Sequence, residues 1–315
     1  MRNARSMDVQ SAALASSQSS VTQEAGSDWA LAKDRERFRV FHIAWYATNF
    51  LLLFATVVAI YSVAWEYSTR KYLKGFSDAI IPASAPPEEK IQAILNWMSA
   101  GPARSGAGPS AALPDRDPSD TLNYNSLLRV CGTATNAFIN LADSSNLAAR
   151  RLLLLDSRRS TKHVDAEVLV NGRWIVVDPV FGTILRSADG GLLTHDQLVD
   201  PAVFSSATQK IPKYDPDYTF ESTSHVRLAR IPIIGVPMRK ALDFVVPGWE
   251  DSTTVSLLLE RESLAAMVAA TIIVLLLALV RVSLRWYGEK RLGIHSVRLR
   301  VQLRRACQAF FDTAG

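Results

Sequence analysis

Residues 163–178 read HVDAEVLVNGRWIVVD, and this stretch decides the fold. The dipeptide Asn171-Gly172 lies between two runs that are rich in β-branched residues. It is the strongest short-range signal for a two-residue type I′ turn between antiparallel strands. Such a turn pairs Val170 with Arg173 and fixes the register of both strands. We therefore expect an antiparallel hairpin over this stretch.

The expected register brings two chemically useful side chains together. Counting back from the turn places Asp165 opposite Asp178. His163 then lies one diagonal step from Asp178 on the same face, because the side-chain period of a strand is two. A diagonal separation of roughly 7 Å between Cβ atoms can be bridged by an imidazole and a carboxylate. The other face is apolar and is expected to be buried: Val164, Ala166, Val168, Val170, Ile175 and Val177.

Cys131 comes just before apolar residues at helical spacing, namely Ala134, Ala137, Phe138 and Leu141. The N-terminus of a helix is the positive end of its dipole, which favours the thiolate form of a Cys. Gly132 leaves room for a substrate to approach the backbone. A nucleophilic Cys, a His that acts as base and an Asp that orients the His make up a catalytic triad. Cys131, His163 and Asp178 are therefore the candidate catalytic residues.

Four motifs follow one another along the chain: Cys131-Gly132, Leu147-Ala-Ala-Arg150, His163-x-x-x-Glu-Val and Gly172-x-Trp-x-x-x-Asp-Pro179. In this order they resemble the transglutaminase-like superfamily of papain-like folds, over roughly residues 87–182. The resemblance implies an α+β domain in which the helix that bears the Cys packs on an antiparallel sheet. Carried over residue by residue, it makes Cys131 the nucleophile, His163 the base and Asp178 the residue that orients the imidazole. With the apolar segments described below, it indicates a membrane-anchored bacterial member.

Two positions depart from the usual pattern of that superfamily. Arg129 stands where a Gly is common, and Val164-Asp165 stands where many members have an aromatic cluster. Taken singly, the site residues also have structural interpretations. A lone Cys is most often a small buried hydrophobe, a His in a strand is often structural, and Asp-Pro is often only a turn. The second function considered is therefore a catalytically inactive, membrane-tethered binding or scaffold module in an envelope or exopolysaccharide assembly.

Two apolar segments are long enough to be transmembrane helices. Residues 40–65 hold no charged residue between Phe41 and Ala64. Aromatic residues lie near both ends of this segment, as is typical of membrane interfaces. Residues 263–281 form the second segment, which is apolar up to Arg281. A buried core helix is the alternative for the first segment.

The distribution of charge predicts the topology. Residues 281–315 carry eight Lys or Arg and two acidic residues. The positive-inside rule therefore places the basic tail, residues 282–315, in the cytoplasm. With two spans, residues 1–39, which are expected to be a disordered tail, lie on the same side. The middle domain, residues 66–262, then faces outward from the inner cell membrane, into the periplasm.

Shorter segments carry further expectations. Pro86-Pro87 followed by two Glu residues predicts the start of a helix. Residues 101–118 are rich in Gly, Pro and Ser and predict a long loop that is disordered or covers the site. Residues 192–199 predict a short helix, with His195 exposed and without function. Residues 214–246 predict edge strands or loops, because prolines interrupt them.

The remaining composition limits the classes of function. Cys131 and Cys307 are the two Cys residues, and in the expected topology they lie on opposite sides of the membrane and cannot pair. A free thiol kept in an oxidising compartment fits catalysis better than a structural role. No Cys/His cluster has metal-ligand spacing and no phosphate-binding loop is present, so no cofactor is expected. No nucleic-acid motif accompanies the net charge of +5, and spans without interior charges disfavour a channel.

The chemistry that these patterns predict is acyl transfer. The thiolate of Cys131 attacks an amide or peptide carbonyl at the cell envelope. The acyl-enzyme then passes to water, as in a cysteine peptidase or amidase, or to an amine, as in a transglutaminase. Hydrolysis is favoured, because transfer to an amine needs a site that excludes water. The expected partners are a protein or peptide substrate, the lipid bilayer and an envelope complex.

Overall fold

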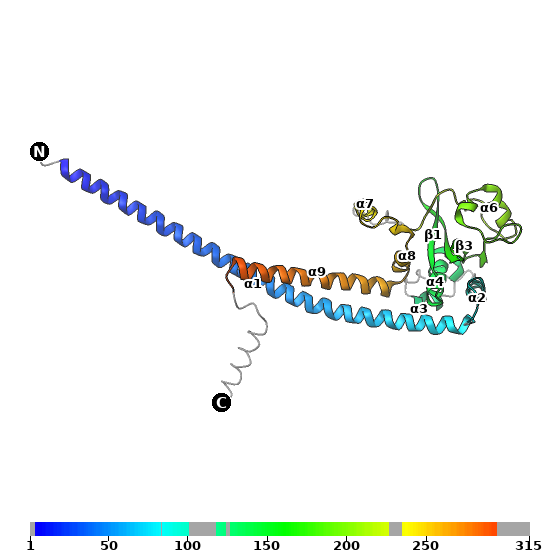
Figure 1. Ribbon diagram of the computed structural model, residues 1–315. Coiled ribbons are helices and arrows are strands. Elements are labelled where there is room, and N and C mark those ends of the chain that lie inside the picture. Colours follow the sequence, from blue (N-terminus) through cyan, green and yellow to red (C-terminus); the bar gives the residue numbers. More distant parts are fainter. Residues whose placement is uncertain (1–3, 83, 101–117, 124–126, 227–234, 295–315) are drawn as a thin grey trace, which may run out of the picture. The chain divides into compact units, whose positions relative to one another are not determined.

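The predicted hairpin lies at the centre of an antiparallel sheet in the structure, a computed structural model (Figure 1). The strands are β1 (Ala149–Leu155), β2 (Thr161–Val170), β3 (Arg173–Asp178), β4 (Thr183–Ile184) and β5 (Thr223–Ser224), in the order β4-β3-β2-β1-β5. The protein is therefore α+β, as expected. The structure describes residues 4–82, 84–100, 118–123, 127–226 and 235–294.

The hairpin turn forms as the sequence predicts. Asn171 and Gly172 both have positive φ angles, of 50° and 78°, as a type I′ turn requires. Val170 pairs with Arg173, and the ladder continues back to the pair of Ala166 and Val177. The predicted register is confirmed. Continued past the pair of Ala166 and Val177, this register brings His163 of β2 close to Asp178 of β3.

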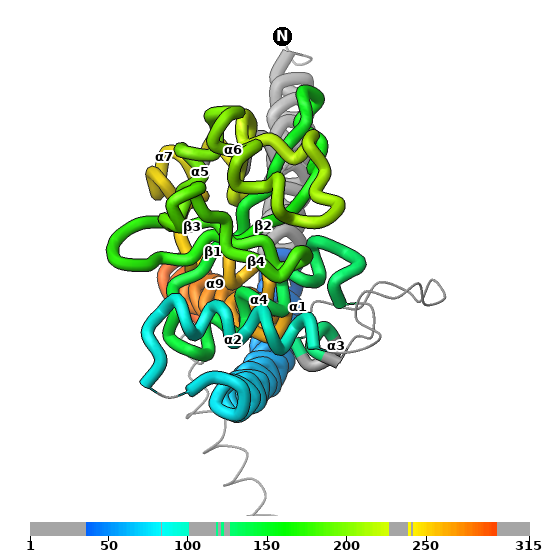
Figure 2. Tube along the Cα trace, turned by 90° about the vertical axis from the view of Figure 1, so that its right-hand side faces the viewer, coloured from blue at the N-terminus to red at the C-terminus, as the bar shows by residue number. Residues whose placement is uncertain are grey.

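Both faces of the sheet are covered (Figure 2). One face packs against α2 (Pro87–Ser99) and α4 (Cys131–Ser144), and the apolar side chains of the hairpin are buried there as expected. The other face, which carries His163, is covered by the segment that contains α5 (His195–Leu198) and α6 (Pro201–Thr208). The second apolar cluster consists of Leu152, Leu154, Val176, Leu185, Leu193, Leu198, Phe204 and Phe220. Polar side chains on this face are thereby withdrawn from water.

The helices on the first face begin at residues that favour the initiation of a helix. Pro87 is the first residue of α2, and Glu88 and Glu89 lie in its first turn, as predicted. The fixed φ of Pro suits the first helical position, and acidic side chains are stabilised at the positive end of the helix dipole. α4 begins at Cys131 after Val130, which has extended backbone angles. Two short helices precede it, α3 (Pro118–Asn123) and η1 (Leu127–Arg129).

The segment after the sheet differs from its prediction. Within the described part of residues 214–246, β5 is the strand that forms, at the edge of the sheet, and α7 (Gly235–Val245) is a helix. Pro237 is compatible with that helix because it lies in the first turn, where backbone N–H groups have no intrahelical acceptor. The predicted strand piece at residues 230–234 lies outside the described residues. The chain continues through η3 (Trp249–Asp251) and α8 (Thr253–Glu260).

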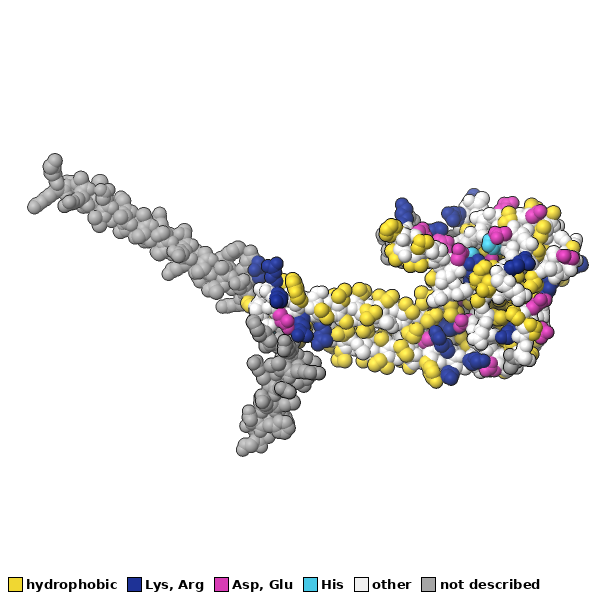
Figure 3. Space-filling view, in the orientation of Figure 1, with side chains coloured by type: hydrophobic (Ala, Val, Ile, Leu, Met, Phe, Trp, Pro, Cys, Tyr) yellow, Lys and Arg dark blue, Asp and Glu magenta, His cyan; other side chains and the backbone are white. Residues whose placement is uncertain are grey.

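Two long helices carry the predicted spans, α1 (Ala4–Ile80) and α9 (Glu262–Arg291). Their stretches Glu36–Ile80 and Glu262–Arg291 are long and apolar enough to cross a membrane. Large apolar side chains are exposed along both helices, including Phe50, Leu53, Phe54 and Val57 of α1 and Leu275, Leu276, Leu279 and Val282 of α9 (Figure 3). An extended exposed apolar surface is uncommon on soluble proteins and marks a contact with lipid or protein.

The backbone of α1 is helical from Ala4. The sequence predicts a disordered tail over residues 1–39, so the described part of that segment differs from its prediction. Ala and Gln are frequent there, and both have high helix propensities. The predicted loop over residues 101–118 falls outside the described residues except for Pro118, and so does the basic tail after residue 294.

The chain divides into a helical unit, residues 1–59 with 270–315, and a globular unit, residues 60–269. In the helical unit the ring of Phe41 lies 6.5 Å from the ring of Tyr287. Gly288 permits this approach, because a Cβ atom there would lie 2.6 Å from the ring of Phe41. The two long helices of this unit therefore pack through close aromatic contacts. The candidate site lies in the globular unit.

Candidate active site

His163 and Asp178 lie on the neighbouring strands β2 and β3, and their side chains meet on the face that α5 and α6 cover. Nε2 of His163 lies 2.9 Å from Oδ2 of Asp178, and the two side chains are 3% and 0% exposed. Oδ1 of Asp178 accepts hydrogen bonds from the backbone N–H groups of Val180 (2.9 Å) and Phe181 (3.1 Å). The Asp-Pro motif therefore forms a turn and also fixes the carboxylate that faces the imidazole.

Cys131 is the first residue of α4, and its side chain is half-buried against a small apolar cluster of β1 and β2. α4 is held on β2 by a hydrogen bond of 2.8 Å from the hydroxyl of Thr135 to the carbonyl of Val164. This bond places the start of α4 beside the strand residue that follows His163. The thiol of Cys131 is near enough to the imidazole of His163 to raise the pKa of that ring. The structure therefore brings His163 and Asp178 into direct contact, with Cys131 nearby.

The surroundings of His163 favour the charged form of its imidazole. Burial alone lowers the pKa of His163, because it removes the charged ring from water. The contacts with Asp165, Asp178 and Cys131 act in the opposite direction and outweigh burial, so the pKa is raised well above the ordinary value of a histidine. The buried ring is therefore an imidazolium that faces two carboxylates.

Aromatic side chains enclose the imidazole. The ring of Tyr218 stacks on that of His163, with 4.3 Å between centroids and 5° between planes. Phe181 lies 6.1 Å from the imidazole, and Tyr214 contacts Tyr218 from the side at 5.8 Å. Burial raises the pKa of Tyr214. Sequence reasoning gave these rings no role. Tyr214 and Tyr218 follow α6 in a segment without regular structure, and Phe181 lies in the turn after β3.

Asp165 is a second carboxylate at the same imidazole. Its Oδ1 lies 3.2 Å from Nε2 of His163, and the side chain is fully buried. Neither of its oxygens accepts a hydrogen bond from any described residue. Burial, together with the charge of Asp178, raises the pKa of Asp165 to about 7. Among the described residues, His163, Asp165 and Asp178 also form a group whose ligand atoms lie within 4.8 Å of one another and could hold a metal ion.

Glu167 is the centre of a separate polar cluster on β2. Its buried carboxylate accepts hydrogen bonds from Nε of Arg150 (2.7 Å), Nδ1 of His195 (2.6 Å) and Nε2 of His225 (2.8 Å). Burial alone raises the pKa of Glu167, but the hydrogen bonds from both histidines and the charge of Arg150 hold it well below its usual range. The guanidinium of Arg150 also stacks over Trp174, 4.1 Å from the ring centroid.

This cluster corrects the expectation for His195. The sequence predicts an exposed residue without function, whereas the side chain is 25% exposed and bound to Glu167. The pKa of His195 is raised, chiefly by the hydrogen bond to that carboxylate. The prediction of an exposed side chain was wrong, because the packing of α5 on the sheet brings His195 to Glu167. His195 is at the start of α5.

A buried charge network connects α4 with α1 and α9 inside the globular unit. Arg261 is 1% exposed, and its guanidinium contacts Glu66 (3.3 Å), Asp143 (2.8 Å) and the amide oxygen of Asn140 (2.8 Å). Ser263 donates a hydrogen bond of 2.7 Å to the other oxygen of Glu66. The second half of the helix that begins with Cys131 is therefore linked through Arg261, which directly precedes α9, to Glu66 of α1.

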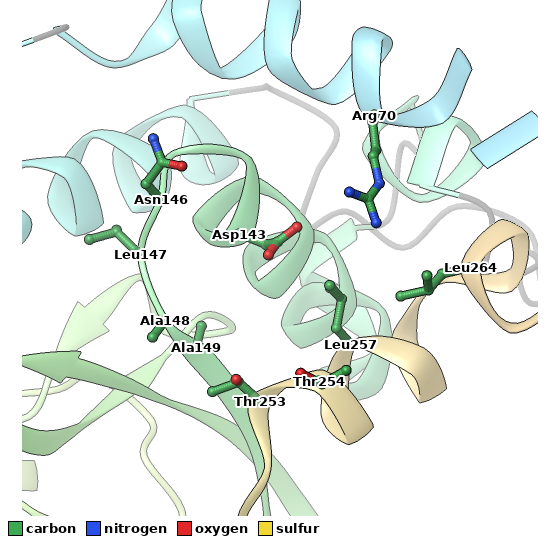
Figure 4. A pocket seen from close by; sticks show the side chains of 10 residues that line it. All are labelled: Arg70, Asp143, Asn146, Leu147, Ala148, Ala149, Thr253, Thr254, Leu257 and Leu264. Atoms are coloured by element: carbon green, nitrogen blue, oxygen red, sulfur yellow. The ribbon is translucent and has the colours of Figure 1, made fainter. Parts of the chain in front are cut away.

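A cavity of about 410 Å³ lies on the side of α4 away from the sheet (Figure 4). Its lining consists of Arg70, Asp143, Asn146, Leu147, Ala148, Ala149, Thr253, Thr254, Leu257 and Leu264. None of the three candidate catalytic residues lines it. This cavity is therefore distinct from the site at His163.

The fold and the site define an α+β protein with a buried Asp–His pair, a free Cys at the start of a neighbouring helix and two apolar helices. In comparisons with known proteins, no family model, no curated protein and no solved structure matches the chain.

Proposed function

We propose that this protein is a membrane-anchored, transglutaminase-like cysteine enzyme with a papain-like fold, which acts on amide or peptide bonds. The observation that carries the proposal is the 2.9 Å contact between His163 and Asp178, with Cys131 interacting with the same imidazole. These are the three groups that nucleophilic acyl transfer requires. The resemblance of the sequence motifs points to the same assignment of roles.

Each nitrogen of the imidazole has a separate role in this mechanism. Nε2 faces the carboxylate of Asp178, which leaves Nδ1 for the sulfur of Cys131. The thiolate attacks the carbonyl carbon of the substrate and forms a C–S bond. The Nδ1 proton passes to the leaving amine as the C–N bond breaks, and a thioester remains. His163 then takes a proton from water as its oxygen attacks the thioester. The C–S bond breaks, the acid is released, and the thiolate of Cys131 again faces the protonated imidazole.

The start of α4 offers donors for the oxyanion of the tetrahedral intermediate. The N–H groups of Thr133 and Ala134 are bound to the carbonyl of Val130. The N–H groups of Cys131 and Gly132 precede them, at helix positions that have no intrahelical acceptor. Donors at a helix N-terminus stabilise negative charge. An amine in place of water would give transamidation, and hydrolysis remains the favoured outcome because Cys131 is partly open to solvent.

The two apolar helices support a location of this domain at a membrane. The helical unit carries basic side chains beyond its apolar surface (Figure 3): Arg37, Arg39, Arg281, Arg285, Lys290 and Arg291. By the positive-inside rule, this end faces the cytoplasm. The globular unit then lies outside the inner membrane, where a protein or peptide of the cell envelope is its substrate.

The second candidate is an inactive, membrane-tethered binding module. It is favoured by the cavity of about 410 Å³ in Figure 4, which the candidate catalytic residues do not line. A ligand bound there would not meet the thiol of Cys131. In that case, the buried Asp–His pair would serve only to stabilise the hairpin.

Alkylation of Cys131 separates the two candidates. Full-length protein in detergent is treated with iodoacetamide between pH 5 and 9, and the peptide that contains Cys131 is followed by mass spectrometry, because Cys307 also reacts. For the enzyme we expect a rate that persists well below pH 8 and collapses in His163→Ala. The matched control is His42→Ala, which removes an exposed histidine of α1. If the alkylation rate of the wild type depends on pH as that of an ordinary thiol does, and His163→Ala does not change it, the enzyme is excluded and the binding module remains.

A further inference from the structure

The carboxylate of Asp165 has a contact with the imidazole of His163 but no hydrogen bond from the described residues. It is fully buried. Nε2 of His163 lies 3.2 Å away, but a single N–H cannot point at two carboxylates, and its shorter contact is the one with Asp178. A buried polar group without a hydrogen-bond partner lowers the stability of the fold, and more so when it is charged. Such a group calls for an explanation beyond packing.

The residues around it form a ligand set. One atom each from His163, Asp165 and Asp178 lies within 4.8 Å of the other two. All three side chains are buried, so the lone pairs of the two carboxylates are not satisfied by bulk water. Two carboxylates and a neutral imidazole carry a charge of −2, which a divalent cation neutralises. The attraction between ion and carboxylate is strong in a site that excludes water.

We infer that His163, Asp165 and Asp178 form a binding site for a divalent transition-metal ion of the zinc type. A nitrogen ligand excludes Mg²⁺ and Ca²⁺ as natural occupants, because these hard cations take oxygen ligands. Zn²⁺ accepts imidazole nitrogen and carboxylate oxygen together. Three protein ligands leave a fourth position for water or a substrate group.

The ion and the Nε2 proton compete for the same nitrogen. When the ion binds, the hydrogen bond between His163 and Asp178 is lost and both carboxylates turn to the metal. The ion-bound and ion-free forms are therefore alternatives. The expectation that the ion-bound form is inactive as an enzyme rests on the proposed function. The expectation that the ion binds does not rest on it.

Zinc binding to the full-length protein in detergent tests the site. The chelator-stripped protein is equilibrated overnight with ZnCl₂, since the ligands are buried, and binding is measured by competition with a chromogenic chelator. We expect one tight site that Asp165→Asn weakens by more than about 100-fold, because loss of an outer hydrogen-bond partner already costs about 10–100-fold. Asp217→Asn, which removes an exposed carboxylate of the same type, should leave the affinity unchanged.

One further variant and one spectroscopic measurement identify the ligands and separate this proposal from the proposed enzyme. Cys131→Ser should keep the zinc site, whereas binding through the thiol would abolish it. X-ray absorption of the wild-type zinc complex should show nitrogen and oxygen ligands without sulfur, and it serves even where Asp165→Asn does not fold. Absence of tight binding, equal binding in Asp165→Asn, or sulfur at the metal would overturn the proposal. None of these results bears on the alkylation of Cys131 in metal-free protein, so the two proposals can fail separately.

Discussion

Nε2 of His163 lies 2.9 Å from Oδ2 of Asp178, and the hydrogen bond joins the two strands of one hairpin. The other oxygen of Asp178 accepts two backbone N–H groups of the turn that follows β3. The carboxylate therefore cannot rotate away from the imidazole without losing its own hydrogen bonds. In contrast, Asp165 contacts the same nitrogen at 3.2 Å but receives no hydrogen bond from the described residues. The position of the Asp178 carboxylate is thus fixed by hydrogen bonds, and Asp178 is the residue suited to orient the imidazole.

Asp178→Asn should slow the alkylation of Cys131. The amide carries no negative charge, so the imidazolium loses its closest carboxylate and its ion pair with the thiolate becomes weaker. A loss of about 1.4 kcal/mol in that interaction lowers the population of the ion pair about tenfold, and we expect a loss of that order in the labelling rate at pH 6. The measurement is the rate of iodoacetamide labelling of the peptide with Cys131. The exposed variant Asp217→Asn should label like wild type, and an unchanged rate in Asp178→Asn would contradict the orienting role.

Gly172→Ala should destabilise the globular unit. Gly172 has a φ of +78°, and an L residue in the left-handed region costs about 1–2 kcal/mol. The matched control is Gly75→Ala in α1, where a Cβ meets no atom within 4 Å. That control should leave the stability unchanged or raise it by about 0.5–1 kcal/mol. Thermal unfolding of the full-length protein in detergent checks both, and similar midpoints for the two variants would argue against a type I′ turn.

Arg261→Met should be among the most damaging single changes. It takes the buried guanidinium away from Glu66, which is 3% exposed and keeps only the largely exposed Arg70 as a cation. Breaking a buried ion pair costs about 3–5 kcal/mol. The control Arg285→Met breaks an exposed pair with Glu289 and should cost less than about 1 kcal/mol. The double variant Arg261→Met with Glu66→Gln should recover part of the loss in unfolding midpoint. No recovery would show that packing rather than charge dominates at this position.

The stability contributed by His195 should depend on pH. Its hydrogen bond to Glu167 raises its pKa in the folded state above the ordinary 6.5. The contribution is therefore fully present below pH 6.5 and is lost as the pH rises through the raised value. His195→Gln should lower stability by about 1 kcal/mol at pH 6 and by less at pH 9. Unfolding midpoints at both pH values test this, with the exposed His42→Gln as control, and an equal loss at both would exclude a charged His195.

Much of the central architecture could be read from local patterns. The dipeptide Asn171-Gly172 fixed the turn, and the period of two along the strands then set the register that the structure has. The start of α2 at Pro87 and the helix after Cys131 follow from capping chemistry and apolar spacing. These signals act over a few residues, where the identity of the neighbours in sequence decides the backbone conformation.

Other features were missed because they depend on what packs over the sheet. The face with His163 was taken as the polar one, yet α5 and α6 bury it. His195 was therefore predicted to be exposed to solvent, although it binds Glu167. The stacking of Tyr218 on the imidazole could not be foreseen either. The residues concerned are far apart in sequence, and no local propensity reports on their contact.

The sequence by itself determined the hairpin, its register and hence the approach of His163 to Asp178, together with two helices apolar enough to cross a membrane. These properties depend on short-range sterics and on periodicity. Only the tertiary structure decided that Cys131 joins the pair, through the hydrogen bond from Thr135 to Val164 that holds α4 on β2. It also decided that Asp165 is buried without a hydrogen-bond donor among the described residues. These two properties, of Cys131 and of Asp165, depend on which surfaces pack against each other in the folded protein. Burial changes the free energy of a polar side chain far more than the residues next to it in sequence do.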